Sequence, residues 1–116
     1  MAQAVIWHNP RCSKSRAALA LLEKRGVKAK VVLYLETPPS AADIKKALGL
    51  LRMAPRGLLR KGEGVYSRLG LGNPALTHAA LIAAMARHPI LIERPVVFCG
   101  RKAALGRPPE AVLEIL

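Results

Sequence analysis

The chain of 116 residues has little cysteine, few aromatic side chains, few acidic residues and no long hydrophobic run. Two cysteines, Cys12 and Cys99, are too few for a disulfide framework or a structural zinc site. No apolar segment reaches the roughly 20 residues that a membrane-spanning helix needs. The first ten residues lack the basic and apolar regions of a signal peptide. We therefore expect a small cytoplasmic globular protein with no bound metal and no membrane contact.

Lysine and arginine number 19 against 7 acidic residues, which gives a formal net charge of +12. Such an excess is typical of proteins that bind nucleic acid, acidic membrane surfaces or anionic substrates. Aromatic residues, on which nucleic-acid bases stack, make up only 3% of the chain. The basic residues are also spread along the sequence. Both observations argue against nucleic acid and indicate that most of these charges are solvated, while a few converge on one site.

Apolar patterns in the first third predict a strand, a helix and a second strand. The run 4–7 predicts a buried strand that ends at a turn. A helical apolar face begins at Ser13 and ends near Gly26. The run 31–35 predicts a second buried strand. Elements of these lengths suit a right-handed parallel βαβ unit.

Two helix-capping patterns stand in the middle of the chain. Ser40 and Asp43 resemble a capping box that opens a helix through about Leu48. Thr77 precedes an apolar helical pattern that stops before Pro89. We therefore expect this part of the chain to be helical.

The last third predicts a β-hairpin and a closing helix. Residues 95–99 and 102–105 are expected to be antiparallel strands, and residues 110–116 a helix. The resulting order is β-α-β, helical insert, β-β-α, which is that of an α/β thioredoxin-like fold with a mixed sheet. We expect a single domain over residues 1–116, with the insert at about 40–88.

The segment between the first strand and the first helix carries the candidate nucleophile Cys12. Unpaired N–H groups and the dipole at a helix N-terminus favour a thiolate there, and the same groups bind oxyanions. Position 15, where a dithiol oxidoreductase carries a second cysteine, is a serine, so any adduct on Cys12 needs an external thiol. The neighbouring side chains suited to stabilising the thiolate or binding the anion are His8, Arg11, Ser15 and Arg16.

Plainer interpretations of these residues stay open. A free cysteine is often a small buried hydrophobe, and this is our interpretation of Cys99 in a predicted strand. For Cys12, the basic neighbours and the position before a helix favour an activated thiolate. His8 has either an orienting and electrostatic role or a structural one.

Several segments of the chain carry a resemblance to one protein family. The segment 8–16 reads His-Asn-Pro-Arg-Cys-Ser-Lys-Ser-Arg, and it is similar to the active-site loop of the glutathione/glutaredoxin-linked arsenate reductase (ArsC) family. Further similar segments follow in the family's order over nearly the whole chain, at 32–38, 58–61, 88–95 and 106–110. The likeness is to short members of the family, which lack the C-terminal extension of the plasmid-type enzymes.

The resemblance implies that the Cys12 thiolate attacks arsenate and forms a covalent thiol–arsenate adduct. Glutathione, a co-substrate and not a bound cofactor, then adds, arsenite leaves, and glutaredoxin resolves the mixed disulfide at Cys12. The arginine triad of the family falls on Arg60, Arg94 and Arg107. Planar guanidinium groups suit this role because they orient an oxyanion and stabilise charge in the transition state.

The arginines also have positions in the predicted elements. A short helix is expected to carry Arg56 and Arg60 one turn apart, so a solvated basic face is an alternative for Arg60. Arg94 precedes Pro95, and the proline that opens this strand in thioredoxin-like folds is usually cis and faces the cysteine. The resemblance therefore places Arg94 beside Cys12.

Three hypotheses of function follow. The first is an arsenate reductase that uses one cysteine and external thiols. The second is a non-enzymatic thioredoxin-fold protein that regulates or binds, such as a redox sensor or a partner of the transcription machinery. The third is nucleic-acid binding through bulk charge, which predicts a steep loss of affinity with salt.

Overall fold

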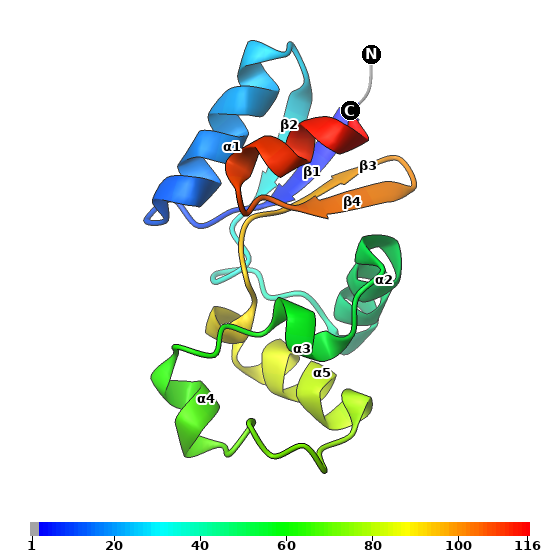
Figure 1. Ribbon diagram of the computed structural model, residues 1–116. Coiled ribbons are helices and arrows are strands. Elements are labelled where there is room, and N and C mark those ends of the chain that lie inside the picture. The colour runs from blue at the N-terminus through cyan, green and yellow to red at the C-terminus, as the bar shows by residue number, and fades with distance from the viewer. Residues whose placement is uncertain (1–2) are drawn as a thin grey trace. The chain divides into compact units, whose positions relative to one another are not determined.

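The computed structural model describes residues 3–116. These residues form two compact units. The first consists of the residues up to Thr37 together with Arg94–Leu116, and the second consists of Pro38–Glu93. The first unit holds the β-sheet and the second is built of helices (Figure 1). Among the described residues, no helix is long and apolar enough to cross a membrane. The organisation as a single domain stays a prediction.

The first unit is built on a four-stranded sheet in the order β2-β1-β3-β4. β1 (Gln3–Trp7) and β2 (Lys28–Val32) are parallel, and α1 (Ser13–Lys24) connects them. β3 (Val96–Cys99) pairs antiparallel with β1, and β4 (Lys102–Leu105) pairs antiparallel with β3. The predicted mixed sheet and the predicted hairpin are therefore confirmed.

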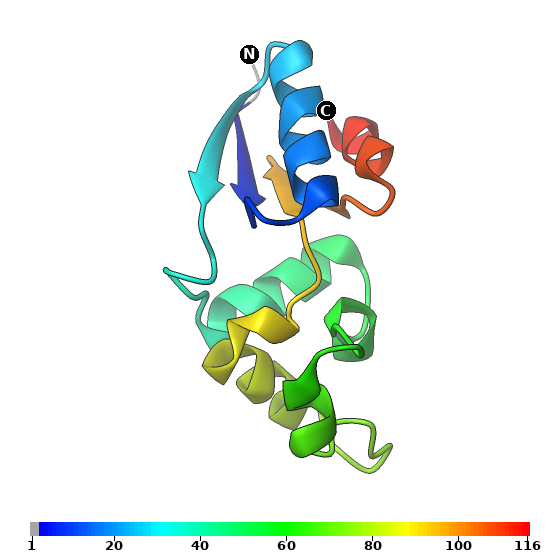
Figure 2. The same cartoon turned by 90° about the vertical axis from the view of Figure 1, so that its left-hand side faces the viewer.

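The core of this unit lies between one face of the sheet and two helices. Figure 2 shows α1 and the closing 3-10 helix η2 (Pro109–Ile115) on the same face of the sheet. Alternate side chains of a strand point to opposite faces, so β1 and β3 each contribute one face to this core. The core residues are at most 1% exposed, and they are Ala4, Ile6, Ala18, Leu22, Val97 and Val112.

The opposite face of the sheet carries an aromatic pair. The rings of Trp7 and Phe98 lie with centroids 5.1 Å apart and planes at 62°, which is an edge-to-face contact. Trp7 pairs with Val96 and Phe98 pairs with Val5, so the two rings are diagonal neighbours on one face of the strands. Edge-to-face aromatic pairs stabilise by about 0.5–1.5 kcal/mol beyond the burial of their area.

The second strand differs from its prediction, since it spans residues 28–32 and is largely exposed. The prediction of a buried strand at 31–35 is wrong because β2 is an edge strand whose pairing with β1 starts just after α1. The chain then turns, and Leu33 accepts hydrogen bonds from the N–H groups of residues 36 and 37. Exposed Lys28 and Lys30 give this edge a positive charge, which discourages pairing with another chain.

In the second unit, α2 (Ala41–Leu51) packs on α5 (His78–Arg87). The predicted capping box of α2 is confirmed: Ser40 Oγ accepts from the Asp43 N–H, and Asp43 Oδ2 accepts from the Ser40 N–H, both at 3.1 Å. Thr77 caps α5 as predicted, with its Oγ1 accepting from a backbone N–H at 3.1 Å. The buried residues of the two helices are Ile44, Ala47, Leu48, Leu81 and Met85.

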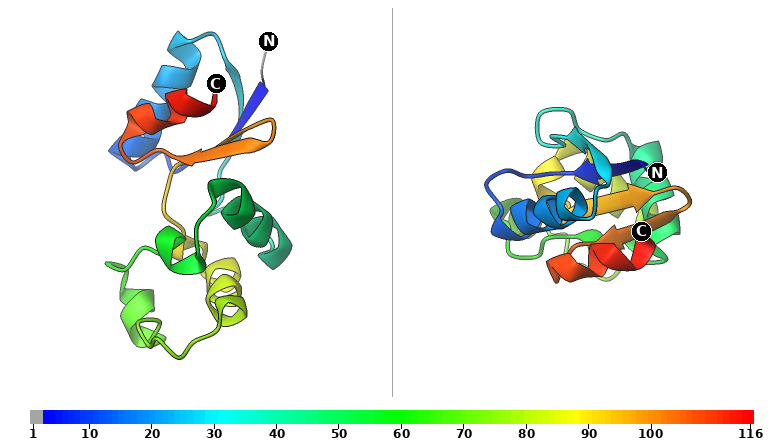
Figure 3. Two further views of the ribbon diagram at one scale, coloured as in Figure 1. Left: turned by 45° about the vertical axis from the view of Figure 1, so that its right-hand side comes forward. Right: turned by 90° about the horizontal axis from the view of Figure 1, so that it is seen from above.

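Short helices complete this unit, namely α3 (Pro55–Leu58), α4 (Gly64–Arg68) and the 3-10 helix η1 (Pro89–Leu91), which Figure 3 shows at left. The prediction that Arg60 shares a helix face with Arg56 is wrong. α3 ends at Leu58 because Leu59 leaves the helix and forms an antiparallel bridge with Ile92, the residue after η1.

Candidate active site

The loop between β1 and α1 is folded by hydrogen bonds of its own. The side-chain oxygen of Asn9 accepts from the Arg11 N–H at 3.0 Å, and the backbone carbonyl of Asn9 accepts from the Cys12 N–H at 3.0 Å. The guanidinium of Arg16 donates to the carbonyl of Pro10 at 2.8 Å. Asn9 was not among the predicted site residues, although an asparagine at a turn is a signal for this kind of side-chain-to-backbone bond. The loop is thus closed around the residue that carries the thiol.

Cys12 is the N-cap residue of α1, as predicted, with extended backbone angles φ −95° and ψ 122°. The residue is only 8% exposed. The backbone N–H groups of Lys14 and Ser15 lower the pKa of the thiol, although the Cys12 side chain forms no cap hydrogen bond. These are two of the donors that the first turn of a helix leaves without an intrahelical partner. The cap position therefore aims the donors of α1 at a thiolate.

The electrostatic surroundings of Cys12 favour the thiolate over the thiol. Burial raises the pKa of this thiol, but four other contributions outweigh burial, so the pKa lies below its ordinary value. In order of size, these are the N–H of Ser15, the charge of Arg94, the N–H of Lys14 and the charge of Arg107. Each interacts more strongly with a negative sulfur than with a neutral one. The result is a thiol that ionises at a lower pH than an ordinary cysteine.

Ser15 and His8 form a buried polar pair beneath the loop. The Ser15 hydroxyl lies 2.7 Å from Nδ1 of His8 and accepts from the Asn9 N–H at 3.0 Å. Ser15 is one of the residues predicted to stabilise the thiolate or bind the anion, and in the structure its hydroxyl forms its hydrogen bonds with His8 and Asn9. Burial and the charge of Arg16 both lower the pKa of His8, which favours the neutral imidazole.

Arg94 lies just before β3 and Arg107 just after β4, in the same unit as Cys12. The Arg94–Pro95 peptide bond is cis, as the resemblance implies, and so is the bond that follows Arg107. A guanidinium N–H of Arg107 donates to the carbonyl of Arg94 at 3.4 Å. Since both charges lower the pKa of Cys12, the two arginines act on the thiol together.

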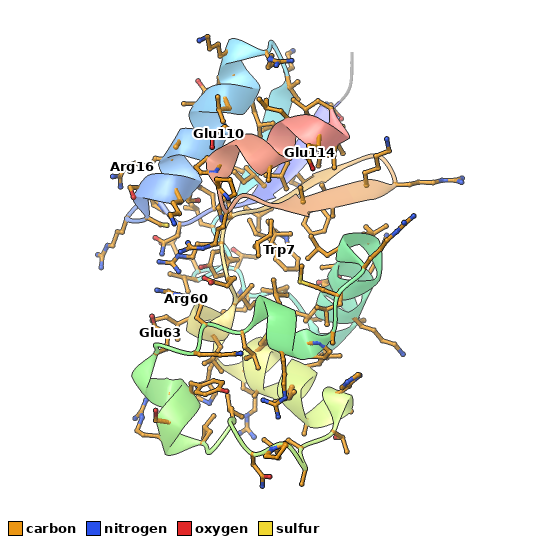
Figure 4. The ribbon with its side chains drawn as sticks, viewed as in Figure 1. Trp7, Arg16, Arg60, Glu63, Glu110 and Glu114 are labelled. Carbon is orange, nitrogen blue, oxygen red and sulfur yellow. The ribbon has the colours of Figure 1, made fainter. Side chains whose placement is uncertain are left out.

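Arg60 belongs to the other unit, and two carboxylates hold its guanidinium. Its Nη2 lies 2.9 Å from Oε2 of Glu63, and its Nε lies 3.7 Å from Oε1 of Glu93. Figure 4 shows Arg60 beside Glu63. Neither carboxylate was predicted as a partner of Arg60; only Glu63 had a local signal, its spacing of three residues from Arg60. That Arg60 shares a site with Cys12 stays a prediction.

Over residues 3–116, no group of three or more His, Cys, Asp or Glu side chains is arranged to hold a metal ion. Cys99 is half-buried in β3 and has no disulfide partner. The chemistry that the described geometry supports is therefore nucleophilic attack by the Cys12 thiolate on an electrophilic anion, with guanidinium and N–H donors available to hold its oxygens.

Comparison with known proteins gives concordant matches over the whole chain. An arsenate reductase of Neisseria meningitidis serogroup A is 50% identical over 117 residues, which cover 100% of both chains. An arsenate reductase of Escherichia coli K12 is 40% identical over 116 residues, which cover 100% of this chain and 82% of the relative. A solved structure of an arsenate reductase from Vibrio cholerae superimposes with a TM-score of 0.97 at 51% identity, covering 99% of this chain and 98% of that chain.

The family model agrees with these relatives. The model of the ArsC family matches residues 7–115, a range that includes the Cys12 loop and all three predicted arginines. The fold is thioredoxin-like, as the order of elements predicts and the structural neighbours confirm. The chain therefore belongs to the ArsC family of arsenate reductases.

Proposed function

We propose that the chain reduces arsenate to arsenite through Cys12 alone, with glutathione and glutaredoxin as the thiol donors. The observation that carries the proposal is the thiolate-favouring site at the N-terminus of α1, where Arg94 and Arg107 also act on the sulfur. Relatives that bear the name arsenate reductase over their full length support arsenate as the anion. The cytoplasm, where glutathione is abundant and thiols stay reduced, is the compartment that such a reaction requires.

In the first step, the Cys12 thiolate attacks the arsenic atom of arsenate. A sulfur–arsenic bond forms, one arsenic–oxygen bond breaks, and the oxygen leaves as water after it is protonated. Arsenic remains As(V). Arg94 and Arg107 offset the repulsion between the anionic nucleophile and the anionic substrate and hold the oxygens in place.

In the second step, glutathione takes arsenic to As(III). The glutathione thiolate forms a disulfide with the sulfur of Cys12, the sulfur–arsenic bond breaks, and its electron pair stays on arsenic, which leaves as arsenite. Glutaredoxin then attacks the glutathione sulfur and frees the Cys12 thiolate, and a second glutathione regenerates glutaredoxin. The sum is one arsenate and two glutathione molecules converted to arsenite, glutathione disulfide and water.

The remaining residues have supporting roles in this proposal. His8 and Ser15 fix the loop from within, because their hydrogen bond ties the end of β1 to the first turn of α1. Arg16 closes the loop from outside through the carbonyl of Pro10. Arg11 adds exposed positive charge beside the nucleophile. We propose Arg60 as the third guanidinium for the arsenate oxygens.

The test is arsenite production from arsenate with glutathione, glutaredoxin, glutathione reductase and NADPH. We expect Cys12→Ser to abolish turnover and Cys99→Ser to leave it largely intact. A parallel reaction with thioredoxin and thioredoxin reductase in place of the glutathione system is expected to give little turnover. Equal activity of the Cys12→Ser variant would refute the mechanism, and a folded wild-type protein without activity would favour the regulatory or binding role.

A further inference from the structure

A cavity of about 350 Å³ lies between the Cys12 loop and the turn that follows β2. Residues 8–11 form one wall, and Leu33, Leu35 and Glu36 form the other. Its volume falls in the range of about 300–1,000 Å³ that is typical of small-molecule sites. All of its lining residues belong to the unit that carries Cys12. The proposed chemistry does not yet assign this cavity a ligand.

The walls of the cavity combine two opposite charges with an apolar surface. Arg11 and Glu36 are both exposed, and within residues 3–116 neither side chain forms a salt bridge. Leu33 and Leu35 are 36% and 40% exposed, which is high for leucine. A ligand that fits both walls has an anionic group, a cationic group and a short uncharged stretch between them.

We propose that this cavity binds glutathione, and this inference rests on the proposed function. Glutathione is a tripeptide thiol with one α-ammonium group and two carboxylates. Glu36 pairs with the ammonium group, Arg11 pairs with a carboxylate, and the two leucines contact the uncharged middle of the peptide. The cavity therefore recognises the co-substrate by its zwitterionic peptide and not by its thiol alone.

The position of the cavity brings a bound tripeptide close to the reacting sulfur. Arg11 precedes Cys12 directly, so their Cα atoms are about 3.8 Å apart. The turn that forms this wall also fixes the nucleophile, since the Cys12 N–H donates to the Asn9 carbonyl. An extended tripeptide spans roughly 10 Å, and its thiol is on the central residue, so a peptide held by Arg11 and Glu36 carries its thiol beside the residue that precedes Cys12.

The same walls are unsuited to arsenate as the occupant. A carboxylate and two leucines line the side opposite Arg11, and the Glu36 carboxylate repels a small anion. The donors that suit an oxyanion, namely the α1 N–H groups and two arginines, act instead on the sulfur of Cys12. The unit thus offers one place for the oxyanion and a neighbouring one for the thiol peptide.

The kinetic test varies glutathione at saturating arsenate. We expect Glu36→Gln to raise the KM for glutathione by about two- to fivefold, the range of an exposed ion pair, and Glu36→Lys to raise it further. The KM for arsenate is expected to stay unchanged in both variants. Glu114→Gln, which removes an exposed carboxylate on η2 (Figure 4), is the matched control and should leave both constants unchanged.

A glutathione analogue without the α-amino group makes this test specific. With deaminated glutathione, wild type and Glu36→Gln should have the same KM, because the partner of the carboxylate is missing. A KM for glutathione that is unchanged in both Glu36 variants, in an enzyme that reduces arsenate, would overturn the inference and leave the proposed function standing.

A binding measurement separates this inference from the proposed activity. In ¹⁵N-labelled Cys12→Ser protein, S-methylglutathione is expected to shift the NMR amide signals of residues 33–36. The shifts should be smaller when Glu36→Gln is added to this variant than when Glu114→Gln is added. Binding of this kind in a protein that reduces no arsenate would uphold the cavity and refute the proposed function. Arsenate that shifts the same amides, or S-methylglutathione that shifts none, would overturn the inference.

Discussion

The substitution Gly106→Ala is expected to lower the free energy of unfolding and, at the same time, to raise the pKa of Cys12. Gly106 joins β4 to Arg107, and its N–H donates to the carbonyl of Pro95 at 2.9 Å. An added Cβ would lie 2.6 Å from Cγ and 3.1 Å from Cδ of the Pro95 ring, and 3.3 Å from a methyl group of Val112. A proline ring and a fully buried valine cannot rotate away, so the backbone has to move.

The magnitude follows from these contacts. Overpacking a well-packed site costs about 1–3 kcal/mol of the free energy of unfolding. With a urea slope of about 2 kcal/mol per M for a small protein, a loss of about 2 kcal/mol lowers the unfolding midpoint by about 1 M. Because Pro95 is bonded to Arg94 and Gly106 to Arg107, the shift also moves both guanidinium groups. We expect the pKa of Cys12 to rise toward its ordinary value.

Urea unfolding and the pH dependence of Cys12 alkylation measure the two effects. Gly49→Ala in α2 is the control, because a Cβ there meets nothing within 4 Å. Alanine in place of a glycine inside a helix stabilises by roughly 0.5–1 kcal/mol, so this variant should unfold at slightly higher urea and alkylate like wild type. An unchanged midpoint together with an unchanged alkylation profile in Gly106→Ala would refute the reasoning.

Two further predictions concern the loop and its charges. Alkylation of Cys12 by iodoacetamide should follow a pKa below that of an ordinary thiol, with the Cys12→Ser variant as the blank for the reaction of Cys99. Arg94→Ala and Arg107→Ala should each shift the alkylation profile to higher pH, because each removes a positive charge that lowers this pKa. A profile insensitive to both changes would contradict the charge effect. Ser15→Ala should lower the free energy of unfolding by about 1–3 kcal/mol, since it leaves the half-buried Asn9 N–H and the buried His8 ring without their partner. The exposed Ser13→Ala should cost no more than about 0.5 kcal/mol in the same urea titration, and equal losses in the two variants would contradict this account.

Local chemistry in the sequence was sufficient to predict the place of Cys12 at a helix N-terminus and the order of elements. Cys12 follows an apolar strand and precedes an apolar helical face, so its place at a helix N-terminus follows from neighbouring residues alone. The capping box at Ser40 and Asp43 depends on residues three positions apart, and it was confirmed for the same reason. The resemblance added Arg94 and Arg107, whose effect on Cys12 the structure then supplied.

Contacts between different segments of the chain decided the features that the sequence did not predict. An apolar run at 31–35 predicted a buried strand, but pairing with β1 put β2 at the sheet edge and shifted it to 28–32. Arg60 leaves its predicted helix because Leu59 bridges Ile92, a residue more than 30 positions away. The partner of the Ser15 hydroxyl, the crowding at Gly106 and the cavity between Arg11 and Glu36 likewise depend on which segments the fold brings together. Sequence periodicity carries only nearest-neighbour information along the chain, so these features follow from tertiary packing alone.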